Sequence, residues 1–191
     1  MSAPELLRAA RSSRAVSQRE LARRAQIAQP RIAEVEAGRH DTTVSRLEQL
    51  LAAMGQRLVV LTTTSPPVYE AATAIRDALA DGDQDGALRE VIQVADDLAR
   101  ADGATCVALA LTRPGPVGDR RWDALLAAVV DHRLTERGLP RPRWVDDPAY
   151  RLDEPWDVEE LTELQAAARA ATPDAISSHG VFLAAEELGS V

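Results

Sequence analysis

Two side chains near position 30, Gln29 and Arg31, carry hydrogen-bonding groups that suit the edges of nucleic acid bases. In the major groove of DNA, a glutamine amide can bond bidentately to adenine and an arginine guanidinium to guanine. Glu34 follows, and its carboxylate could accept a hydrogen bond from cytosine, although DNA phosphates repel a negative charge. The alternative is that all three are solvated polar side chains on an exposed helix. Base contact requires a helix that presents them to the groove.

The surrounding sequence, Ser17 to Gly38, predicts two short helices joined by a tight turn. Ser17 and Glu20 have the spacing of a capping box, in which each side chain accepts a hydrogen bond from the backbone N–H of the other residue. Pro30 suits the first turn of the second helix, because an N–H there would have no partner within the helix. The pattern is typical of a helix-turn-helix, whose inner faces would be lined by Leu21, Ala22, Ala25, Ile32, Ala33 and Val35.

This segment resembles the DNA-binding domains of Xre/Cro-like repressors, in which a pattern like S-Q-x-E-L-A is followed by S-Q-P-x-I-S-x-I-E-x-G. The chain has SQRELA and AQPRIAEVEAG at these places. It departs from the pattern at Ala28, where the family usually has a serine or threonine that caps the recognition helix. The resemblance covers residues 4–62 and implies a lambda-repressor-like domain of four or five helices, followed by a short strand.

The resemblance also implies roles for individual residues. Three residues of the recognition helix would face base edges, namely Gln29, Arg31 and Glu34. Three others would contact the phosphate backbone of DNA, namely Gln18, Arg39 and His40. Gln18 would in addition brace the recognition helix. Arg11 and Glu36 would form a structural ion pair that ties the first helix to the third.

Charge is distributed unevenly along the chain. Residues 1–64 contain ten arginines and six carboxylates, whereas the remaining residues contain twelve arginines and twenty-four carboxylates, and the whole chain has a net charge of −8. A basic segment within an acidic chain fits DNA binding, because neutralising phosphates requires local rather than overall positive charge. Ordinary variation in charge along the chain is the alternative interpretation.

Apolar periodicity completes the first domain with helices over 4–13 and 43–54. Residues 57–61, RLVVL, are rich in β-branched side chains and too few for a helix, so they predict a strand. That strand needs a partner, which could be the same strand of a second subunit or a later strand over 180–183. Pairing across a two-fold axis would give a homodimer suited to two DNA half-sites.

Ser65, Pro66 and Pro67 mark the predicted boundary between a DNA-binding domain, residues 1–64, and a second domain, residues 65–191. The second domain is expected to be mostly helical, and the fold class of the whole chain is therefore mainly α. Residues 104–112 are ambiguous between a helix and a buried strand. The helices predicted in the second domain cover residues 68–80, 85–101, 121–137 and 157–171.

Aromatic residues lie in and beside an acidic run, residues 146–163, that contains eight carboxylates and one arginine. Trp144, Tyr150 and Trp156 could pack in the core or form a surface that binds a basic partner protein. The stretches RRWDALLAAVVDH, WVDDPAYRLDEPW and ATPDAISSHGVFLAAEEL loosely resemble a module of antitoxin-like regulators that are paired with nucleotidyltransferase-like toxins. This second resemblance implies promoter binding by one domain and toxin binding by the other.

Few residues suggest chemistry in the second domain. Cys106 is the single cysteine and lies in an apolar run, so neither a disulfide within the chain nor a reactive thiol is expected. His132 and His179 have no ligand at metal-binding spacing beside them, so we expect no metal, no cofactor and no enzymatic activity. No apolar stretch is long enough to span a membrane, and a cytoplasmic location is expected.

The sequence thus predicts a DNA-binding repressor, the autoregulating antitoxin of a toxin–antitoxin pair. Two alternatives stay open. One is a transcription regulator whose second domain binds a small-molecule effector, which would require a pocket with convergent polar groups. The other is an enzyme domain fused to the helix-turn-helix, which would require a cluster of strongly perturbed ionisable groups.

Overall fold

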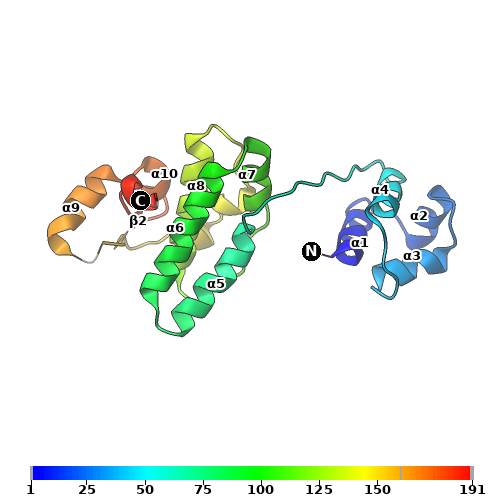
Figure 1. Ribbon diagram of the computed structural model, residues 1–191, viewed down its shortest axis with the longest axis horizontal. Coiled ribbons are helices and arrows are strands. Elements are labelled where there is room, and N and C mark those ends of the chain that lie inside the picture. Colours follow the sequence, from blue (N-terminus) through cyan, green and yellow to red (C-terminus); the bar gives the residue numbers. More distant parts are fainter. Residues whose placement is uncertain (1, 160, 190–191) are drawn as a thin grey trace. The chain divides into compact units, whose positions relative to one another are not determined.

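The structure, a computed structural model, describes residues 2–159 and 161–189. The chain divides into two compact units, Met1–Leu61 and Thr62–Val191, which we call unit 1 and unit 2. Each unit has its own apolar core, and both are built mainly from helices (Figure 1). The predicted mainly α fold class, with an N-terminal helix-turn-helix domain, is confirmed.

Within residues 2–61, unit 1 contains four helices, α1 Ala3–Ser13, α2 Gln18–Arg24, α3 Gln29–Glu36 and α4 Val44–Ala52. The side-chain hydroxyl of Thr43 caps α4 by accepting a hydrogen bond from the Arg46 N–H. Each helix turns an apolar stripe inward, as amphipathic helices do. The core that results includes Leu7, Leu21, Ile32, Leu50 and Leu51.

The strand predicted over residues 57–61 is not formed within the described chain. Val59 and Val60 are 76% and 65% exposed, and this segment belongs to no sheet among the described residues. A strand needs a neighbour to pair its backbone groups. The neighbour predicted within the chain, residues 180–183, contains a strand that pairs with another segment. Strand β2, Val181–Phe182, pairs in parallel with β1, Trp156–Asp157.

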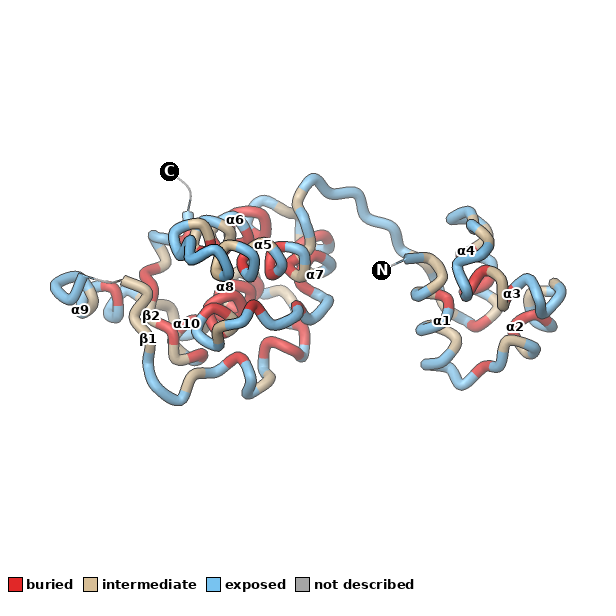
Figure 2. Tube along the Cα trace, turned by 90° about the horizontal axis from the view of Figure 1, so that it is seen from below, coloured by how far each residue is buried: buried red, intermediate tan, exposed pale blue. Residues whose placement is uncertain are grey.

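The core of unit 2 surrounds α8, Arg120–Glu136, whose residues 124–130 are all buried. This helix is apolar around most of its circumference, so neighbours must cover it on several sides. Helices α6 Gln84–Arg100 and α7 Gly103–Ala110 pack against it, as do short elements of the C-terminal part, whereas α5 Val68–Ala80 packs mainly against α6. Figure 2 shows buried segments gathered around α8. The ambiguous residues 104–112 thus form a helix for most of their length, with Asp102 as its N-cap.

The C-terminal part of unit 2 consists of short elements. They are the 3-10 helices η1 Arg143–Asp146, η2 Pro148–Tyr150 and η3 Ala185–Leu188, the strands β1 and β2, and the helices α9 Thr162–Ala171 and α10 Asp174–Ser177. The helix predicted over 157–171 starts at Thr162 instead of Asp157. The reason is that Asp157 belongs to β1 and pairs with Phe182, which holds its backbone extended.

Gly180 occupies a tight position just before β2. Its φ of +75° is in the left-handed region, and an added Cβ would lie 2.8 Å from the carbonyl oxygen of Leu152. We expect Gly180→Ala to lower the free energy of unfolding of unit 2 by about 2–4 kcal/mol, because backbone strain and a steric clash add. Urea titration followed by tryptophan fluorescence measures this, since all three tryptophans of the chain lie in unit 2.

Gly138 provides the matched control for this substitution. Its φ is +62°, but no atom lies within 4 Å of the added Cβ, so Gly138→Ala introduces the strain alone. That variant should lose about 1 kcal/mol. Equal losses in the two variants would mean that the contact with Leu152 relaxes at little cost.

Candidate nucleic-acid interface

Helix α2 begins at the predicted cap. The Oγ of Ser17 accepts a hydrogen bond from the Glu20 N–H at 3.1 Å. The second half of the predicted capping box is not formed among the described contacts, because the Glu20 carboxylate accepts hydrogen bonds from Arg23 and Arg24 at 2.6 and 2.7 Å. The bonds from Arg23 and then Arg24 lower the pKa of Glu20 to about 2. Arginines one turn along the helix thus compete with the Ser17 backbone N–H for this carboxylate.

The turn between α2 and α3 is tight. Gln26 has a φ of +55°, and the Ile27 N–H donates to the carbonyl oxygen of Ala22 at 3.0 Å. A left-handed residue other than glycine costs about 1 kcal/mol or more, so packing must hold the turn in place. Ala28 then starts α3 without a side-chain cap, as its departure from the repressor pattern indicated.

Helix α3 buries one side and exposes the other. Its residues Ile32, Val35 and Glu36 are buried. Gln29 is exposed at the N-terminal end of the helix, and Arg31 and Glu34 lie one turn apart with 49% and 44% of their side chains exposed. The three predicted base-contacting residues are therefore all accessible on α3.

A chain of hydrogen bonds links the exposed end of α3 to the core of unit 1. The side-chain Nε2 of Gln29 donates to Oε1 of Gln18 at 3.0 Å, and Nε2 of Gln18 donates to Oε2 of Glu36 at 2.8 Å. The Arg11 guanidinium donates to both oxygens of Glu36, at 2.7 and 3.0 Å. The ion pair between the residues named by the resemblance is therefore present. Gln18 uses both ends of its amide to join α2 to α3.

Glu36 is the centre of this chain and is only 3% exposed. Burial raises the pKa of its carboxyl group, but hydrogen bonds from Arg11 and Gln18 outweigh burial, so the pKa is lowered overall. The carboxylate therefore stays ionised inside unit 1. Its contacts hold the first three helices together and orient the Gln29 amide.

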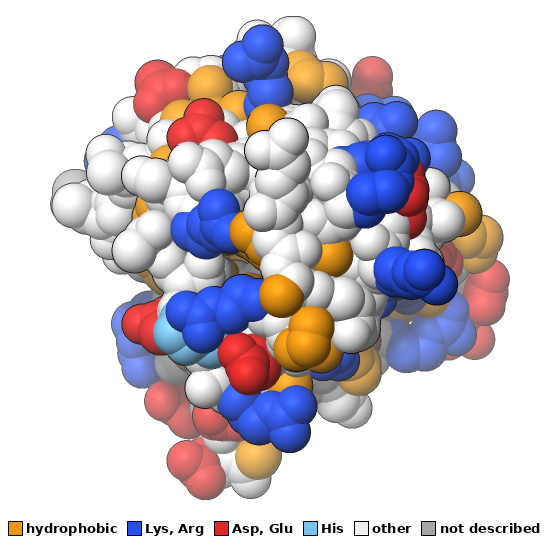
Figure 3. Space-filling model, turned by 90° about the vertical axis from the view of Figure 1, so that its right-hand side faces the viewer, with side chains coloured by type: hydrophobic (Ala, Val, Ile, Leu, Met, Phe, Trp, Pro, Cys, Tyr) orange, Lys and Arg blue, Asp and Glu red, His pale blue; other side chains and the backbone are white. Residues whose placement is uncertain are grey.

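The two residues just beyond α3 have different surroundings. Arg39 is exposed, and its backbone N–H donates to the carbonyl oxygen of Glu34. The Nε2 of His40 lies 2.7 Å from an Nη atom of Arg31. Basic side chains occur at several places across the face of the molecule seen in Figure 3, in keeping with the excess of arginine in the first 64 residues. Such a surface attracts phosphates.

The proposed aromatic partner surface is wrong for two of its three residues. Trp144 and Tyr150 are buried, and their rings meet edge to face with centroids 5.2 Å apart. The Trp144 Nε1–H donates to the carbonyl oxygen of Ala110, and the Tyr150 hydroxyl to that of Pro114. Helices η1 and η2 turn these rings into the core, where each polar end finds a partner.

Trp156 is half-buried. Its ring packs against Trp122, with centroids 5.7 Å apart, and the Arg121 guanidinium lies 5.5 Å from its centroid. Of the three aromatic residues, Trp156 alone therefore retains exposed surface that a partner could contact.

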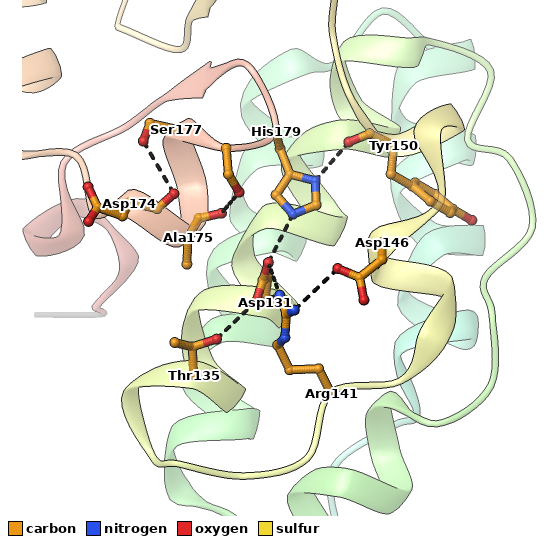
Figure 4. A network of polar contacts seen from close by, with 10 residues as sticks. Asp131, Thr135, Arg141, Asp146, Tyr150, Asp174, Ala175, Ser177 and His179 are labelled. Atoms are coloured by element: carbon orange, nitrogen blue, oxygen red, sulfur yellow. Dashed lines mark hydrogen bonds and ion pairs between the residues drawn. The ribbon is translucent and has the colours of Figure 1, made fainter.

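Unit 2 contains a buried polar network that the sequence did not reveal (Figure 4). The two nitrogens of the His179 ring lie 2.8 Å from the Tyr150 carbonyl oxygen and 3.2 Å from Oδ2 of Asp131. Arg141 donates to both oxygens of Asp131 at 2.8 Å, and the Thr135 hydroxyl donates at 3.0 Å. Asp131 and His179 are 48 residues apart, so no local spacing could have indicated this contact.

The network explains the protonation state of Asp131. Burial raises the pKa of this carboxyl group, but hydrogen bonds from His179, Arg141 and Thr135 outweigh burial and lower the pKa to about 2. Both ring nitrogens of His179 are engaged, and its side chain is 1% exposed. The imidazole therefore has no free nitrogen to act as a general base in this arrangement. Its contacts hold α8 to the C-terminal segments.

Comparison with known proteins identifies the N-terminal part of the chain. Residues 7–61 match the helix-turn-helix family model. Comparisons with curated proteins and with solved structures give no match. The family match supports a DNA-binding transcription regulator. It lies within unit 1 and includes all the residues predicted to contact DNA: Gln18, Gln29, Arg31, Glu34, Arg39 and His40.

Among residues 2–159 and 161–189, no group of three or more histidine, cysteine, aspartate or glutamate side chains could hold a metal ion. Over the same residues, no helix is both long and apolar enough to cross a membrane.

Proposed function

We propose that the chain is a sequence-specific transcriptional repressor that inserts α3 into the major groove of its operator. The observation that carries this proposal is the exposure of Gln29 and Arg31 on α3, with Gln29 held by Gln18 and Glu36. An amide fixed in this way is preorganised for contact with a base, which limits the entropy lost on binding. Repression would follow from occlusion of the promoter.

A gel-shift titration of the full chain against its own upstream DNA and a scrambled duplex tests the proposal. Binding should be stronger to the upstream DNA at two salt concentrations, because phosphate contacts weaken with salt on both duplexes while base contacts distinguish them. Equal binding to both duplexes, or binding to neither, would contradict the proposal.

Arg31→Ala is expected to weaken specific binding by about 1–3 kcal/mol and to leave nonspecific binding nearly unchanged, because Arg31 is assigned to a base edge. Arg76→Ala is the matched control, since Arg76 is an exposed arginine on α5 that pairs with Asp77. It should bind both duplexes like the unaltered chain. If Arg31→Ala lost equal affinity for both duplexes, Arg31 would be a phosphate contact.

We also propose that the repressor is a homodimer. The segment 57–61 supports this. Its two valines are exposed, its backbone pairs with no strand of the described chain, and β-branched side chains favour strand conformation. Pairing of this segment with its copy across a two-fold axis would place two α3 helices on successive half-sites. A stable monomer at micromolar concentration in sedimentation equilibrium would contradict this arrangement.

A narrower proposal is that the repressor is an antitoxin whose acidic unit 2 binds a basic, nucleotidyltransferase-like toxin. Its support is the three sequence stretches quoted above and the excess of carboxylates beyond residue 64. A toxin partner would be encoded beside the gene for this chain, so the test is to add the product of that adjacent gene to the gel shift. The proposal would be rejected if the DNA complex were unchanged and the product did not bind this chain.

A further inference from the structure

The guanidinium of Arg31 is held on two sides. One Nη atom lies 2.7 Å from Nε2 of His40, and the other donates to Oε2 of Glu34 at 3.4 Å. A guanidinium can only donate, so Nε2 of His40 must be the acceptor. This assigns the imidazole proton to Nδ1 and makes the ring neutral in this contact. Of the two contacts, that with His40 is the shorter.

His40 is well placed to act as a fixed acceptor. It lies in the segment between α3 and α4 and is half-buried, whereas the Arg31 side chain is half-exposed. The two residues line the same shallow pocket, whose apolar part is formed by Ile27, Val35 and Leu50. The charged groups on this pocket besides Arg31 are Asp41 and Arg46. A half-buried ring loses less freedom on binding Arg31 than a fully exposed side chain would.

The contacts leave Arg31 able to bind a base. A guanidinium carries five N–H groups in one plane. His40 and Glu34 use one each, on different Nη atoms. The remaining three include one N–H on each Nη atom and the N–H on Nε, which suffices for a bidentate contact with guanine. The geometry therefore fixes the guanidinium without consuming its capacity for recognition.

We infer that His40 is a positioning residue for Arg31, so that it determines specificity through Arg31 rather than binding phosphate. This inference rests on the proposed function of α3. It replaces the phosphate role that the repressor resemblance implied for His40. Arg39 beside it is exposed and keeps its implied contact with the DNA backbone.

A phosphate contact and a positioning role for His40 predict different dependences of DNA affinity on salt and on sequence. A cationic phosphate contact releases counterions, so its loss would weaken binding to every duplex and reduce the salt slope by about 0.9. A neutral imidazole that orients Arg31 releases no counterion. Its loss should therefore reduce binding only where Arg31 recognises its base pair, with the salt slope unchanged.

The experiment starts with selection of binding sites by the full chain from a randomised duplex pool. The base pair recognised by Arg31 is the one at which Arg31→Ala loses its preference. Affinity is then measured on the selected duplex and on one altered at that pair, for His40→Ala, His40→Gln, Arg31→Ala and the double variant. Far-ultraviolet circular dichroism establishes that each variant is folded.

We expect His40→Ala to bind the selected duplex about 3- to 10-fold more weakly, the loss typical of one hydrogen bond, and to bind the altered duplex almost unchanged. The double variant should bind like Arg31→Ala, since His40 acts through Arg31. His40→Gln should restore part of the preference, because its amide oxygen can accept a hydrogen bond from Arg31.

Other outcomes overturn the inference. If His40→Ala weakened binding to both duplexes equally and flattened the salt dependence, His40 would be a phosphate contact. If the affinity lost in His40→Ala added fully to that lost in Arg31→Ala, or if His40→Ala had no effect on affinity, the two residues would act independently. Failure of the unaltered chain to select any sequence would overturn the proposed function itself, which distinguishes the two failures.

Discussion

Replacing Asp131 by asparagine is expected to lower the free energy of unfolding of unit 2 by about 2–4 kcal/mol, because it removes the buried negative charge that faces His179 and the partly exposed Arg141. The carboxylate accepts hydrogen bonds from Arg141, Thr135 and His179 inside the protein. Asparagine has one oxygen and an NH₂ group, so it would turn donors toward donors and leave Arg141 with only the exposed Asp146 as its anion. Tryptophan fluorescence during urea titration reports this loss, because every tryptophan lies in unit 2.

Asp146→Asn is the matched control for this substitution. Asp146 accepts a hydrogen bond from the same arginine at 3.2 Å, but its side chain is 52% exposed. Water screens such a pair, so its removal should cost less than about 1 kcal/mol. If the two variants were equally stable, the buried network would contribute no more than an ordinary surface ion pair. DNA binding by unit 1 should be unaffected in both.

The difference in free energy of unfolding between the unaltered chain and the Asp131→Asn variant should become smaller in acid. The pKa of Asp131 in the folded chain is about 2, below its ordinary value of 3.8. A lowered pKa means that ionisation stabilises the folded state above about pH 4, and that this stabilisation is lost as the pH falls toward 2. Urea titrations at pH 6 and pH 2.5 measure the change. A difference independent of pH would show that the charge of Asp131 is not the cause.

The helices that carry the candidate site could be predicted because their signals are local. Ser17 and Thr43 cap α2 and α4 as short polar side chains do at helix starts, and Pro30 lies in the first turn of α3. The apolar periodicity then decided which side of each helix faces the core. The pattern around Gln29 and Arg31 therefore gave both the helix and its exposed residues.

Contacts between distant residues could not be predicted in the same way. Trp144 and Tyr150 stand beside prolines and carboxylates, which suggested a surface, and only the turns of η1 and η2 bury them. The strands β1 and β2 have two residues each, too few for an alternating pattern. Likewise the contact of His40 with Arg31 depends on the path of the chain after α3, which no spacing rule determines.

Glu36→Gln is expected to lower the free energy of unfolding of unit 1 by about 3 kcal/mol, a loss comparable to that expected for Asp131→Asn in unit 2. Glu36 is buried and receives hydrogen bonds from Arg11 and Gln18. A glutamine there keeps the size but removes the charge, so the Arg11 guanidinium, which is 18% exposed, loses its anion in a poorly solvated place. Because the pKa of Glu36 is lowered in the folded chain, the carboxylate stabilises unit 1 at neutral pH and less so in acid.

Unit 1 contains no tryptophan, tyrosine or phenylalanine, so its unfolding is silent in fluorescence. The variant should therefore lose helical circular dichroism at a lower urea concentration while its tryptophan transition stays unchanged. Glu34→Gln is the control on the exposed side of α3, and its stability should change by less than about 0.5 kcal/mol. A shift of the tryptophan transition by Glu36→Gln would contradict the assignment of this effect to unit 1.

The same substitution should weaken specific DNA binding even where unit 1 remains fully folded. Gln18 joins Glu36 to Gln29, and a glutamine at position 36 has only one acceptor oxygen, for which Arg11 and Gln18 compete. The Gln18 amide and, through it, the Gln29 amide are therefore held less firmly. A base contact made by a freer side chain costs more entropy on binding. Affinity for the operator should therefore fall more than affinity for a scrambled duplex at a temperature well below the unfolding transition. If both affinities were unchanged there, Glu36 would stabilise the domain without orienting Gln29.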